Sequence, residues 1–196
     1  MIYYPAFLNL KGKNVLLFGA GEVALRKAKS LIESEAKLSV ISRDFSNAFI
    51  RFAKSKKIKL KKGNQILKQF RNISLVVAAT SDPVFNRAIY KACSRKGIWV
   101  NVVDDPVNSS FIAPSVIRRG NLQMAISTGG ASPLLAKLLR QKFEAELNTK
   151  YADLVRFLKK QRIKVKKTIL NSKDRQKYFY RLVQSKLSEL NGGRKK

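Results

Sequence analysis

Small residues stand at fixed intervals directly after an apolar run near the start of the chain. Gly19, Gly21 and Ala24 follow the run 15–18 in the pattern G-x-G-x-x-A. The first glycine permits a tight turn off a strand, the second lets the backbone approach a phosphate, and the small third residue lets a helix pack closely on the sheet. The free N–H groups of that helix would then face an anion. The stretch predicts a strand, a turn and a helix around the pyrophosphate of a dinucleotide.

A charged pair closes the next strand-like run, at the distance that a βαβ unit requires. Arg43 and Asp44 follow the apolar run 38–41. Asp44 would accept hydrogen bonds from the ribose hydroxyls, which favours NAD, whereas Arg43 would meet a 2′-phosphate, which favours NADP. Taken alone, Arg43 could equally be part of a solvated charged pair that ends a strand and binds nothing. The pair therefore leaves the choice of cofactor open.

Carboxylates are the main acid–base groups that this chain offers. The sequence has no histidine and one cysteine, Cys93, which lies in a predicted helix and is interpreted as a packing residue. Histidine is the usual proton shuttle and a common ligand of transition metals. Proton transfer must therefore fall to carboxylates, lysines, tyrosines or the substrate, and a His/Cys metal site is excluded. Asp104 follows an apolar run, in a place where a carboxylate could take a proton.

Strands and helices alternate over the first hundred residues. Beyond the first βαβ unit we expect a helix over 45–55, strands over 58–60 and 75–79, a helix over 83–95, and a strand over 98–103. Asp82 as N-cap and Pro83 at the first helical position begin the second of these helices. This alternation predicts a doubly wound parallel sheet with its ligand at the carboxyl ends of the strands. Thr80 and residues 101–105 should then lie beside the glycine turn.

A different pattern follows residue 111. Gly120 and Asn121 separate two strand-like runs, which predicts an antiparallel hairpin. Ser132 and Pro133 then begin a helix with an apolar stripe of the kind that packs on a partner subunit. Further helices are expected from residue 151 onwards.

The expected architecture is an α/β fold in three parts. Residues 1–112 form a Rossmann-like, NAD-binding domain, residues 113–147 a small α+β dimerisation region of hairpin plus helix, and residues 148–196 a helical C-terminal region. With 196 residues and 45% apolar content, the chain is long enough to bury a core of this size. No apolar run approaches membrane-spanning length, and no basic and apolar leader begins the chain, so we expect a cytoplasmic protein without a membrane partner.

The formal net charge of +29 has three explanations. Clustered lysine and arginine bind the phosphates of nucleic acid, a positive field attracts a polyanionic small substrate, and a lysine-rich composition also produces solvated faces that bind nothing. The lysine runs 54–62 and 164–167 lack the interleaved aromatic residues of a single-strand binding surface. Nucleic acid is therefore the less favoured partner despite the charge.

Five motifs occur in order along most of the chain. They cover residues 19–28, 77–80, 101–106, 110–115 and 127–133. Their succession resembles the precorrin-2 dehydrogenase and sirohydrochlorin ferrochelatase family, the siroheme synthase amino-terminal module. The resemblance weakens after residue 147.

The resemblance implies an enzyme of siroheme biosynthesis. It implies NAD-dependent oxidation of precorrin-2 to sirohydrochlorin, joined in some members to insertion of ferrous iron to give siroheme, and a homodimer. Precorrin-2 is a polycarboxylate, so the expected partner of the excess basic residues is an anionic tetrapyrrole. Because the sequence offers no obvious metal ligands, iron would have to enter the macrocycle directly.

The resemblance also assigns residues. Asp104 matches the aspartate implicated in catalysis, where it would either take a proton or hold the substrate. The expected cofactor-binding residues are Gly19, Gly21, Glu22, Val23, Arg43, Asp44 and Thr80. The expected substrate-binding residues of the family loop are Ser127, Thr128, Gly129 and Gly130. Arg118 and Arg119 are added as basic residues that could bind the anionic substrate.

One alternative is a basic Rossmann module that senses nucleotides or binds nucleic acid without chemistry. It explains the charge and the glycine turn. It does not explain the motifs at 101–106 and 128–133.

Overall fold

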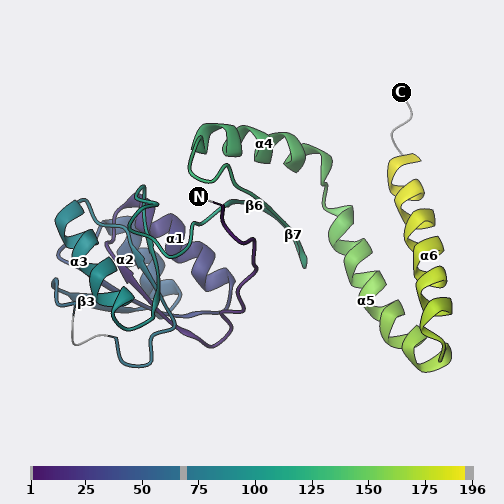
Figure 1. The fold of residues 1–196 in the computed structure, drawn as a ribbon, viewed down its shortest axis with the longest axis horizontal. Helices are drawn as coiled ribbons and strands as arrows, with labels where there is room; N and C mark the ends of the chain where they lie inside the picture. The colour runs from purple at the N-terminus through teal and green to yellow at the C-terminus, as the bar shows by residue number, and fades with distance from the viewer. Residues whose placement is uncertain (1, 67–69, 193–196) are drawn as a thin grey trace. The chain divides into compact units, whose positions relative to one another are not determined.

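The computed structural model describes residues 2–66 and 70–192 and divides the chain into two compact units. The first unit is Met1–Ala113 and the second is Pro114–Lys196. In Figure 1 the first runs from purple to teal and the second from green to yellow. Each unit is described by itself below. No helix among the described residues is both long enough and apolar enough to cross a membrane.

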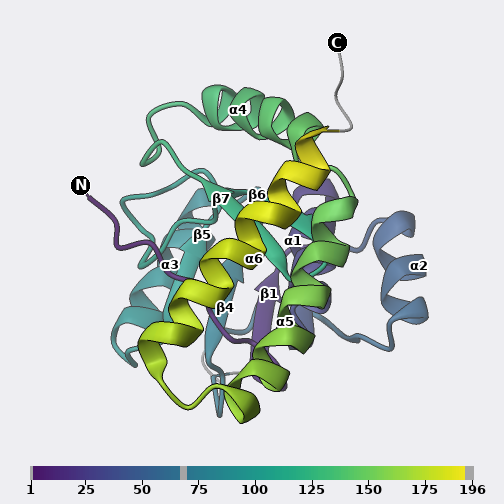
Figure 2. The same ribbon diagram turned by 90° about the vertical axis from the view of Figure 1, so that its right-hand side faces the viewer.

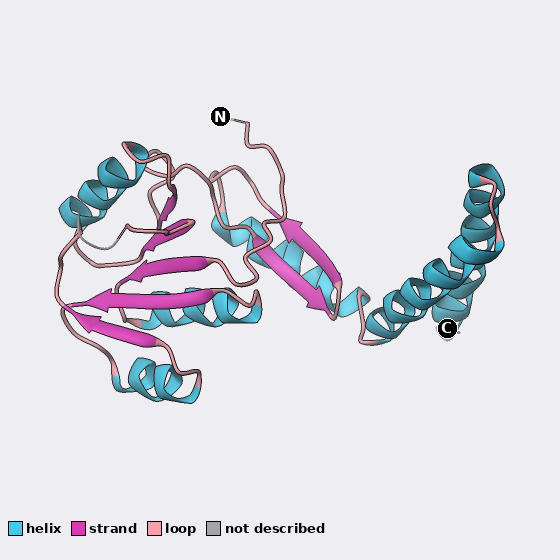
Figure 3. Ribbon diagram, turned by 90° about the horizontal axis from the view of Figure 1, so that it is seen from below, coloured by secondary structure: helices cyan, strands magenta, loops and turns pink. Residues whose placement is uncertain are grey.

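The first unit is a parallel sheet with helices packed on it (Figure 3). Its strands lie in the order β3-β2-β1-β4-β5, and every pairing between them is parallel. This confirms the predicted Rossmann-like, doubly wound α/β class. The strands are β1 (Asn14–Phe18), β2 (Lys37–Ser42), β3 (Lys59–Lys62), β4 (Leu75–Ala78) and β5 (Trp99–Val102), and the helices are α1 (Glu22–Glu33), α2 (Asn47–Ser55) and α3 (Pro83–Ser94).

The register brings the carboxyl ends of four strands into line. Phe18 at the end of β1 pairs with Ile41 of β2 and with Ala78 of β4, and Ala78 pairs in turn with Val102 of β5. The loops that follow these strands therefore leave the sheet at the same edge. This edge is where an open α/β sheet binds its ligand.

Alternate residues of β1 face opposite sides of the sheet, and both sides are covered. Val15 and Leu17 lie in a buried cluster with α1 and α2, whereas Leu16 and Phe18 lie in a second cluster with α3. A parallel strand buried on both faces needs an unbroken apolar sequence, because neither face meets water. This explains why the strand reads as a continuous apolar run rather than an alternating one.

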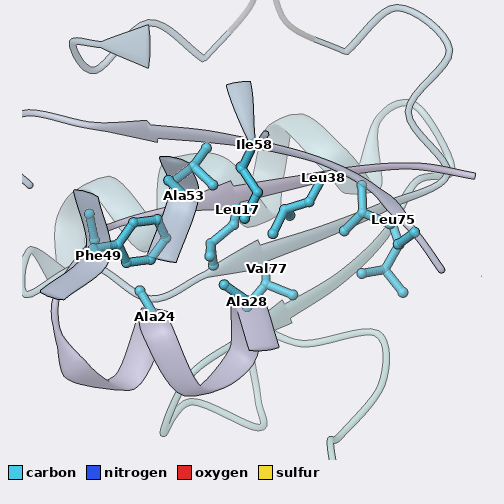
Figure 4. Close-up of a cluster of buried hydrophobic side chains, with 13 residues drawn as sticks. Leu17, Ala24, Ala28, Leu38, Phe49, Ala53, Ile58, Leu75 and Val77 are labelled. Carbon is cyan, nitrogen blue, oxygen red and sulfur yellow. The ribbon is translucent and has the colours of Figure 1, made fainter. Parts of the chain in front are cut away.

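Small residues let α1 approach the sheet closely. Ala24 and Ala28 are fully buried and share a cluster with Leu17 and Val77 (Figure 4). This confirms the packing that the alanine of the G-x-G-x-x-A pattern predicts. A larger side chain at either alanine would overpack this contact.

The caps predicted for two helices are confirmed. The Asp82 carboxylate accepts a hydrogen bond from the Phe85 N–H at 2.9 Å, and Pro83 is the first residue of α3. The Ser132 hydroxyl accepts from the Leu135 N–H at 3.2 Å ahead of Pro133. In both cases a side chain satisfies a backbone donor that has no partner within the helix.

Two predicted boundaries move for identifiable reasons. The helix expected over 45–55 begins at Asn47, because the Ser46 hydroxyl accepts the Phe49 N–H and so caps the helix there. The strand expected over 58–60 is shifted to Lys59–Lys62. Ile58 is buried, and its N–H donates to the Ala53 carbonyl in the turn after α2.

The second unit contains the predicted hairpin and the predicted helices. Strands β6 (Ser115–Arg119) and β7 (Leu122–Ile126) pair antiparallel across a two-residue turn, with Arg119 opposite Leu122. Helices α4 (Pro133–Glu146), α5 (Lys150–Thr168) and α6 (Ser172–Gly192) follow. Helices α5 and α6 lie side by side in both Figure 1 and Figure 2. On α4 the stripe of Leu134, Leu135 and Leu138 is exposed.

Candidate functional site

A cavity of about 670 Å³ opens at the carboxyl ends of the strands in the first unit. The loops after β1, β2, β3, β4 and β5 and the first residues of α1 contribute to its wall. All the predicted cofactor-binding residues line it, together with Asp104. These residues are Gly19, Gly21, Glu22, Val23, Arg43, Asp44 and Thr80.

Two glycines shape the turn between β1 and α1 in different ways. Gly19 has φ +103°, and a Cβ placed on it would run into the carbonyl group of Ala79. Gly21 has φ −79°, and among the described residues no atom lies within 4 Å of a Cβ placed on it. The protein itself therefore requires glycine at position 19, whereas glycine at position 21 leaves open space in the cavity.

The first turn of α1 faces this open space with its backbone donors. Gly21 is the N-cap of the helix, and within the described part of the chain no side chain caps it. The N–H groups of a first helical turn need a partner, and the helix dipole makes that partner an anion. A pyrophosphate at this turn would satisfy them, so the residues present fit a dinucleotide.

The loop after β2 is fastened to the glycine turn. The Ser46 hydroxyl donates to the Ala20 carbonyl at 3.0 Å, and the Ser42 hydroxyl donates to the Asp44 carbonyl at 2.6 Å. These bonds hold the backbone of Arg43 and Asp44 at the cavity, where the sequence places the adenosine end.

The cavity wall includes a segment after β3 that was not expected from the sequence. Gly63 and Asn64 follow β3 and line the same cavity, and the Gly63 N–H donates to the Ser42 carbonyl at 2.9 Å. The signal was available in the topology, since β3 is parallel to β2 and must end at the same edge. The predicted strand ended at residue 60, which placed these two residues too far along the loop.

Thr80 lines the cavity while its hydroxyl is used inside the protein. Its Oγ1 donates to the Asn86 Oδ1 at 2.7 Å, and the Asn86 amide donates back to the Thr80 carbonyl at 3.0 Å. Asn86 is buried, so this pair satisfies a polar side chain that would otherwise be costly to bury. Thr80 thus fixes the turn between β4 and α3 that forms one wall of the cavity.

Asp104 lies directly beyond β5 in an unusual backbone conformation. Its φ is +59°, a region that favours glycine and costs other residues roughly 1 kcal/mol. The Val103 N–H donates to the Ala78 carbonyl at 2.9 Å, which holds the chain against β4 just before this turn. The strained turn places an exposed carboxylate on the wall of the cavity. Strained residues of this kind cluster at functional sites.

The neighbours of Asp104 in the same motif have structural partners. Asp105 accepts hydrogen bonds from the Asn108 N–H at 3.1 Å and from its side-chain amide at 2.7 Å. Asn101 is buried and its amide donates to the Phe111 carbonyl at 3.1 Å. Neither residue lines the cavity, in contrast to the expectation that all of 101–105 would lie beside the glycine turn.

Lys27 on α1 has a shifted pKa, although no sequence pattern distinguishes it from its neighbours Arg26 and Lys29. Burial is the largest influence on Lys27 and lowers its pKa, the charge of Arg26 lowers it further, and the charge of Asp104 raises it. Lys27 is therefore a partly desolvated cation on α1.

In the second unit, the loop 127–132 is internally ordered. The Thr128 hydroxyl donates to the Ser132 carbonyl at 3.1 Å and accepts from the Ser132 N–H at 3.0 Å, and the Ser127 hydroxyl accepts from the Gly129 N–H at 3.1 Å. Gly129 and Gly130 have positive φ, at 63° and 92°. The expected substrate loop is thus a defined turn that leads into the first turn of α4.

The two expected substrate arginines lie on β6. Arg119 uses most of its guanidinium within the second unit: Nε donates to the Leu147 carbonyl at 2.6 Å and Nη2 to the Glu144 carbonyl at 3.2 Å. Its Nη1 pairs with the Glu144 carboxylate, which Arg140 also contacts. A substrate carboxylate would have to share Arg119 with the end of α4. The role expected of Arg118 stays a prediction.

The described residues contain neither a metal-ligand cluster nor a reactive thiol. Within residues 2–66 and 70–192, no group of three or more His, Cys, Asp or Glu side chains is placed to hold a metal ion. Cys93 is fully buried, and burial raises the pKa of its thiol to about 12. Cys93 thus lies on the buried face of α3 as a packing residue, as predicted from the sequence.

Two family models match the chain. Residues 6–115 match a model described as putative NAD(P)-binding, and residues 119–146 match a model described as sirohaem biosynthesis protein central. The first match covers the unit that holds the cavity.

Curated relatives and a solved structure are also similar. The siroheme synthase of Buchnera aphidicola subsp. Acyrthosiphon pisum is 40% identical over 196 residues, which cover 99% of this chain and 41% of the relative. The siroheme synthase of Nitrosomonas europaea is 33% identical, over 97% of this chain and 40% of the relative. The chain therefore spans about two fifths of the length of these relatives. A solved structure titled SirC, precorrin-2 dehydrogenase, superposes with a TM-score of 0.77 at 24% identity, over 92% of this chain and 89% of that one.

These similarities agree with the resemblance drawn from the five motifs, and the solved structure independently reproduces the fold. The cavity in the first unit lies inside the region that matches the NAD(P)-binding model, so its class of cofactor is a nicotinamide dinucleotide. The chain belongs to the putative NAD(P)-binding family.

Proposed function

We propose that this chain oxidises precorrin-2 to sirohydrochlorin with NAD as cofactor. The observation that carries the proposal is that the glycine turn and Asp104 line one cavity. Bound NAD would supply the hydride acceptor. Oxidation removes one hydride and one proton from the macrocycle, so the site needs a group beside the cofactor that can receive the proton.

Asp104 is the residue proposed for this task. Its carboxylate either takes the proton as the hydride leaves or holds the macrocycle in place for the transfer. Both roles require a carboxylate at the cavity wall, and the strained turn after β5 keeps one there. The absence of histidine from the sequence leaves few other groups that could act as a base near neutral pH.

NAD rather than NADP is proposed because Asp44 lines the cavity and follows β2, where a Rossmann-like fold would hold the adenosine. Its carboxylate would accept from both ribose hydroxyls and would repel a 2′-phosphate. Arg43 works against this preference, since it would attract that phosphate. Affinities for NAD and NADP measured side by side by titration calorimetry test the proposal, and tighter binding of NADP would contradict it.

The proposed substrate follows from the net charge of the chain. A net charge of +29 attracts a polycarboxylate at long range, and this attraction weakens as salt rises. The loop 127–130 and Arg118 are proposed to contact the substrate.

The exposed Leu134, Leu135 and Leu138 on α4 are proposed to pack against a second copy of the chain. Sedimentation at micromolar concentration tests the dimer, and a purely monomeric species would contradict it.

The decisive experiment is a conversion assay. Purified protein is mixed under anaerobic conditions with NAD and precorrin-2 made enzymatically, and the spectra of sirohydrochlorin and NADH are followed. Formation of both in equal amounts is expected. Binding of NAD without any conversion would contradict the proposal and favour the nucleotide-sensing alternative.

Iron insertion is proposed as a second step on the same macrocycle. Ferrous iron is here a substrate that enters sirohydrochlorin directly, with Asp104 receiving pyrrole protons. Adding ferrous iron to the completed reaction, against a blank without protein, tests this step. A rate of siroheme formation equal to the blank would contradict it without affecting the dehydrogenase proposal.

A further inference from the structure

A second cavity, of about 510 Å³, lies in the second unit between α5 and α6. The two helices run side by side in Figure 2, and each contributes one side of the cavity wall. The α6 side runs from Ser172 to Gln184, with its lining residues at spacings of three and four, so they form one face of the helix. At about 1.5 Å per residue this face is ~18 Å long. The α5–α6 cavity is therefore large enough for a small organic ligand.

Three cations line the α5–α6 cavity, and no carboxylate is among the described residues of its wall. Arg162 and Lys166 lie one turn apart on α5, and Arg175 lies on α6. Within the described part of the chain, none of the three belongs to an ion pair. A cleft lined by charge of one sign concentrates ligands of the opposite sign. The wall is therefore suited to a ligand with more than one anionic group.

The guanidinium of Arg175 is held in place at this wall. Its Nη1 donates to the Ile169 carbonyl at 2.8 Å and to the Leu170 carbonyl at 2.5 Å, in the turn that joins the two helices. These acceptors are uncharged, so they orient the guanidinium without neutralising it. An arginine that is already ordered loses less side-chain entropy when it binds an anion.

Two aromatic rings from α6 share the wall with these cations. Phe179 and Tyr180 both line the cavity, and Tyr180 is 67% exposed, so its ring is available to a ligand. The lysine run 164–167 has no interleaved aromatic residue in the sequence, whereas the fold supplies aromatic rings beside Lys166 from the neighbouring helix. Exposed aromatic rings stack on flat ligands, and nearby cations bind the anionic groups that such ligands carry.

We propose that the α5–α6 cavity binds a flat ring that carries several anionic groups. The anionic groups pair with Arg162, Lys166 and Arg175, and the ring stacks on Tyr180. A carboxylated tetrapyrrole and a nucleoside polyphosphate share this chemistry. The inference goes beyond the proposed function, because no residue of this wall lines the cofactor cavity of the first unit. It is tested by binding alone, without turnover.

Three probes separate the ring from the charge in titration calorimetry on the full chain. Uroporphyrin is a flat tetrapyrrole polycarboxylate, ATP is a nucleoside polyphosphate, and tripolyphosphate carries similar charge without a ring. We expect uroporphyrin or ATP to bind at least about fivefold more tightly than tripolyphosphate, since stacking on one aromatic side chain adds this much affinity. The tighter of the two identifies the source of the ligand. Tripolyphosphate that binds as tightly as both, or no binding of any probe, would overturn the inference.

Paired charge variants test the location of binding. The double variant Arg162→Gln with Lys166→Gln removes two cations from the cavity wall. The control, Lys164→Gln with Lys167→Gln, removes two cations from the same helix outside the wall. Affinity for the bound probe should fall about tenfold or more in the first and less than about twofold in the control, because hydrogen bonds to charged groups are lost only in the first. Equal losses would show a general attraction to the net charge and would overturn the inference.

Variants of Tyr180 test the stacking contact. Tyr180→Ala removes the ring and Tyr180→Phe keeps it, and circular dichroism checks that both retain the helices. We expect Tyr180→Ala to weaken the ring-bearing probe about fivefold and to leave tripolyphosphate unchanged, whereas Tyr180→Phe should bind as the unmutated protein does. Unchanged affinity in a folded Tyr180→Ala would overturn the inference. Failure of the conversion assay would instead overturn the proposed function and leave this binding result standing.

Discussion

Gly19 lies so close to Ala79 that a Cβ on the glycine would stand 2.8 Å from the carbonyl carbon of the alanine. Gly19 also has φ +103°, which side chains rarely adopt. Gly19→Ala should therefore force β1 and β4 apart at the edge of the cavity. We expect a loss of about 2–4 kcal/mol in the free energy of unfolding, measured by urea denaturation. A variant as stable as the unmutated protein would contradict the close approach.

Gly21→Ala is the matched contrast. The φ of −79° at Gly21 suits alanine, and the described structure leaves space for the added methyl group. The fold should lose no more than about 1 kcal/mol, the cost of a poorer N-cap residue. The methyl group would occupy the space proposed for the pyrophosphate. We expect the affinity for NAD to fall at least about tenfold in calorimetry, and unchanged affinity would place the phosphates elsewhere.

Asp104→Asn removes the carboxylate while it preserves the turn, because asparagine tolerates a positive φ. Turnover of precorrin-2 should fall by about 100-fold or more, as expected for loss of a proton acceptor. The dissociation constant of NAD should stay within about twofold. Asp105→Asn serves as the control, since Asp105 caps the following turn and lies outside the cavity wall. Retained turnover in Asp104→Asn would remove this residue from the reaction.

Local pattern was enough to predict the elements of the first unit and part of the cavity wall. The glycine turn, the Asp82 cap and the apolar strands each follow from interactions within a few residues. The topology then places Thr80 and Asp104 beside Gly19, because parallel strands end at one edge. Fold class and the candidate cofactor site were therefore both accessible from the sequence.

Tertiary contacts account for what the sequence could not predict. Lys27 on α1 is half-buried whereas the neighbouring Arg26 and Lys29 are exposed, and only packing distinguishes it from them. Arg119 was selected as a substrate ligand, yet its guanidinium reaches Glu144 and Leu147, more than twenty residues away. Such partners depend on how the hairpin docks on α4, which hydrophobic periodicity does not specify.

Arg119→Ala distinguishes a structural from a substrate-binding role. Two carbonyls at the end of α4 would lose their donors, so we expect a loss of about 1–3 kcal/mol in stability. KM for precorrin-2 should change by less than about threefold. The control is Lys137→Met, which removes an exposed charge from α4. A large rise in KM with unaltered stability would instead support Arg119 as a ligand of the substrate.

Cys93 should be inert in the folded protein. Burial raises the pKa of its thiol to about 12, so at pH 8 the reactive thiolate is a very small fraction. Since the thiolate forms only as pH approaches the raised pKa, labelling by Ellman's reagent should be slow throughout pH 6–9. It should become fast in denaturing guanidinium chloride. Rapid labelling of the native protein would show that α3 opens readily.

The approach of Gly19 to Ala79 also bears on how the protein is made. Strand β1 pairs with β2 on one side and with β4 on the other. On the ribosome the first βαβ unit emerges before β4. At that stage Gly19 therefore lacks its packing contact with Ala79. The cavity forms only after β4 has paired with β1 and the chain has been synthesised beyond Asp104. Nucleotide capture by a nascent chain should therefore begin abruptly, late in translation of the first unit.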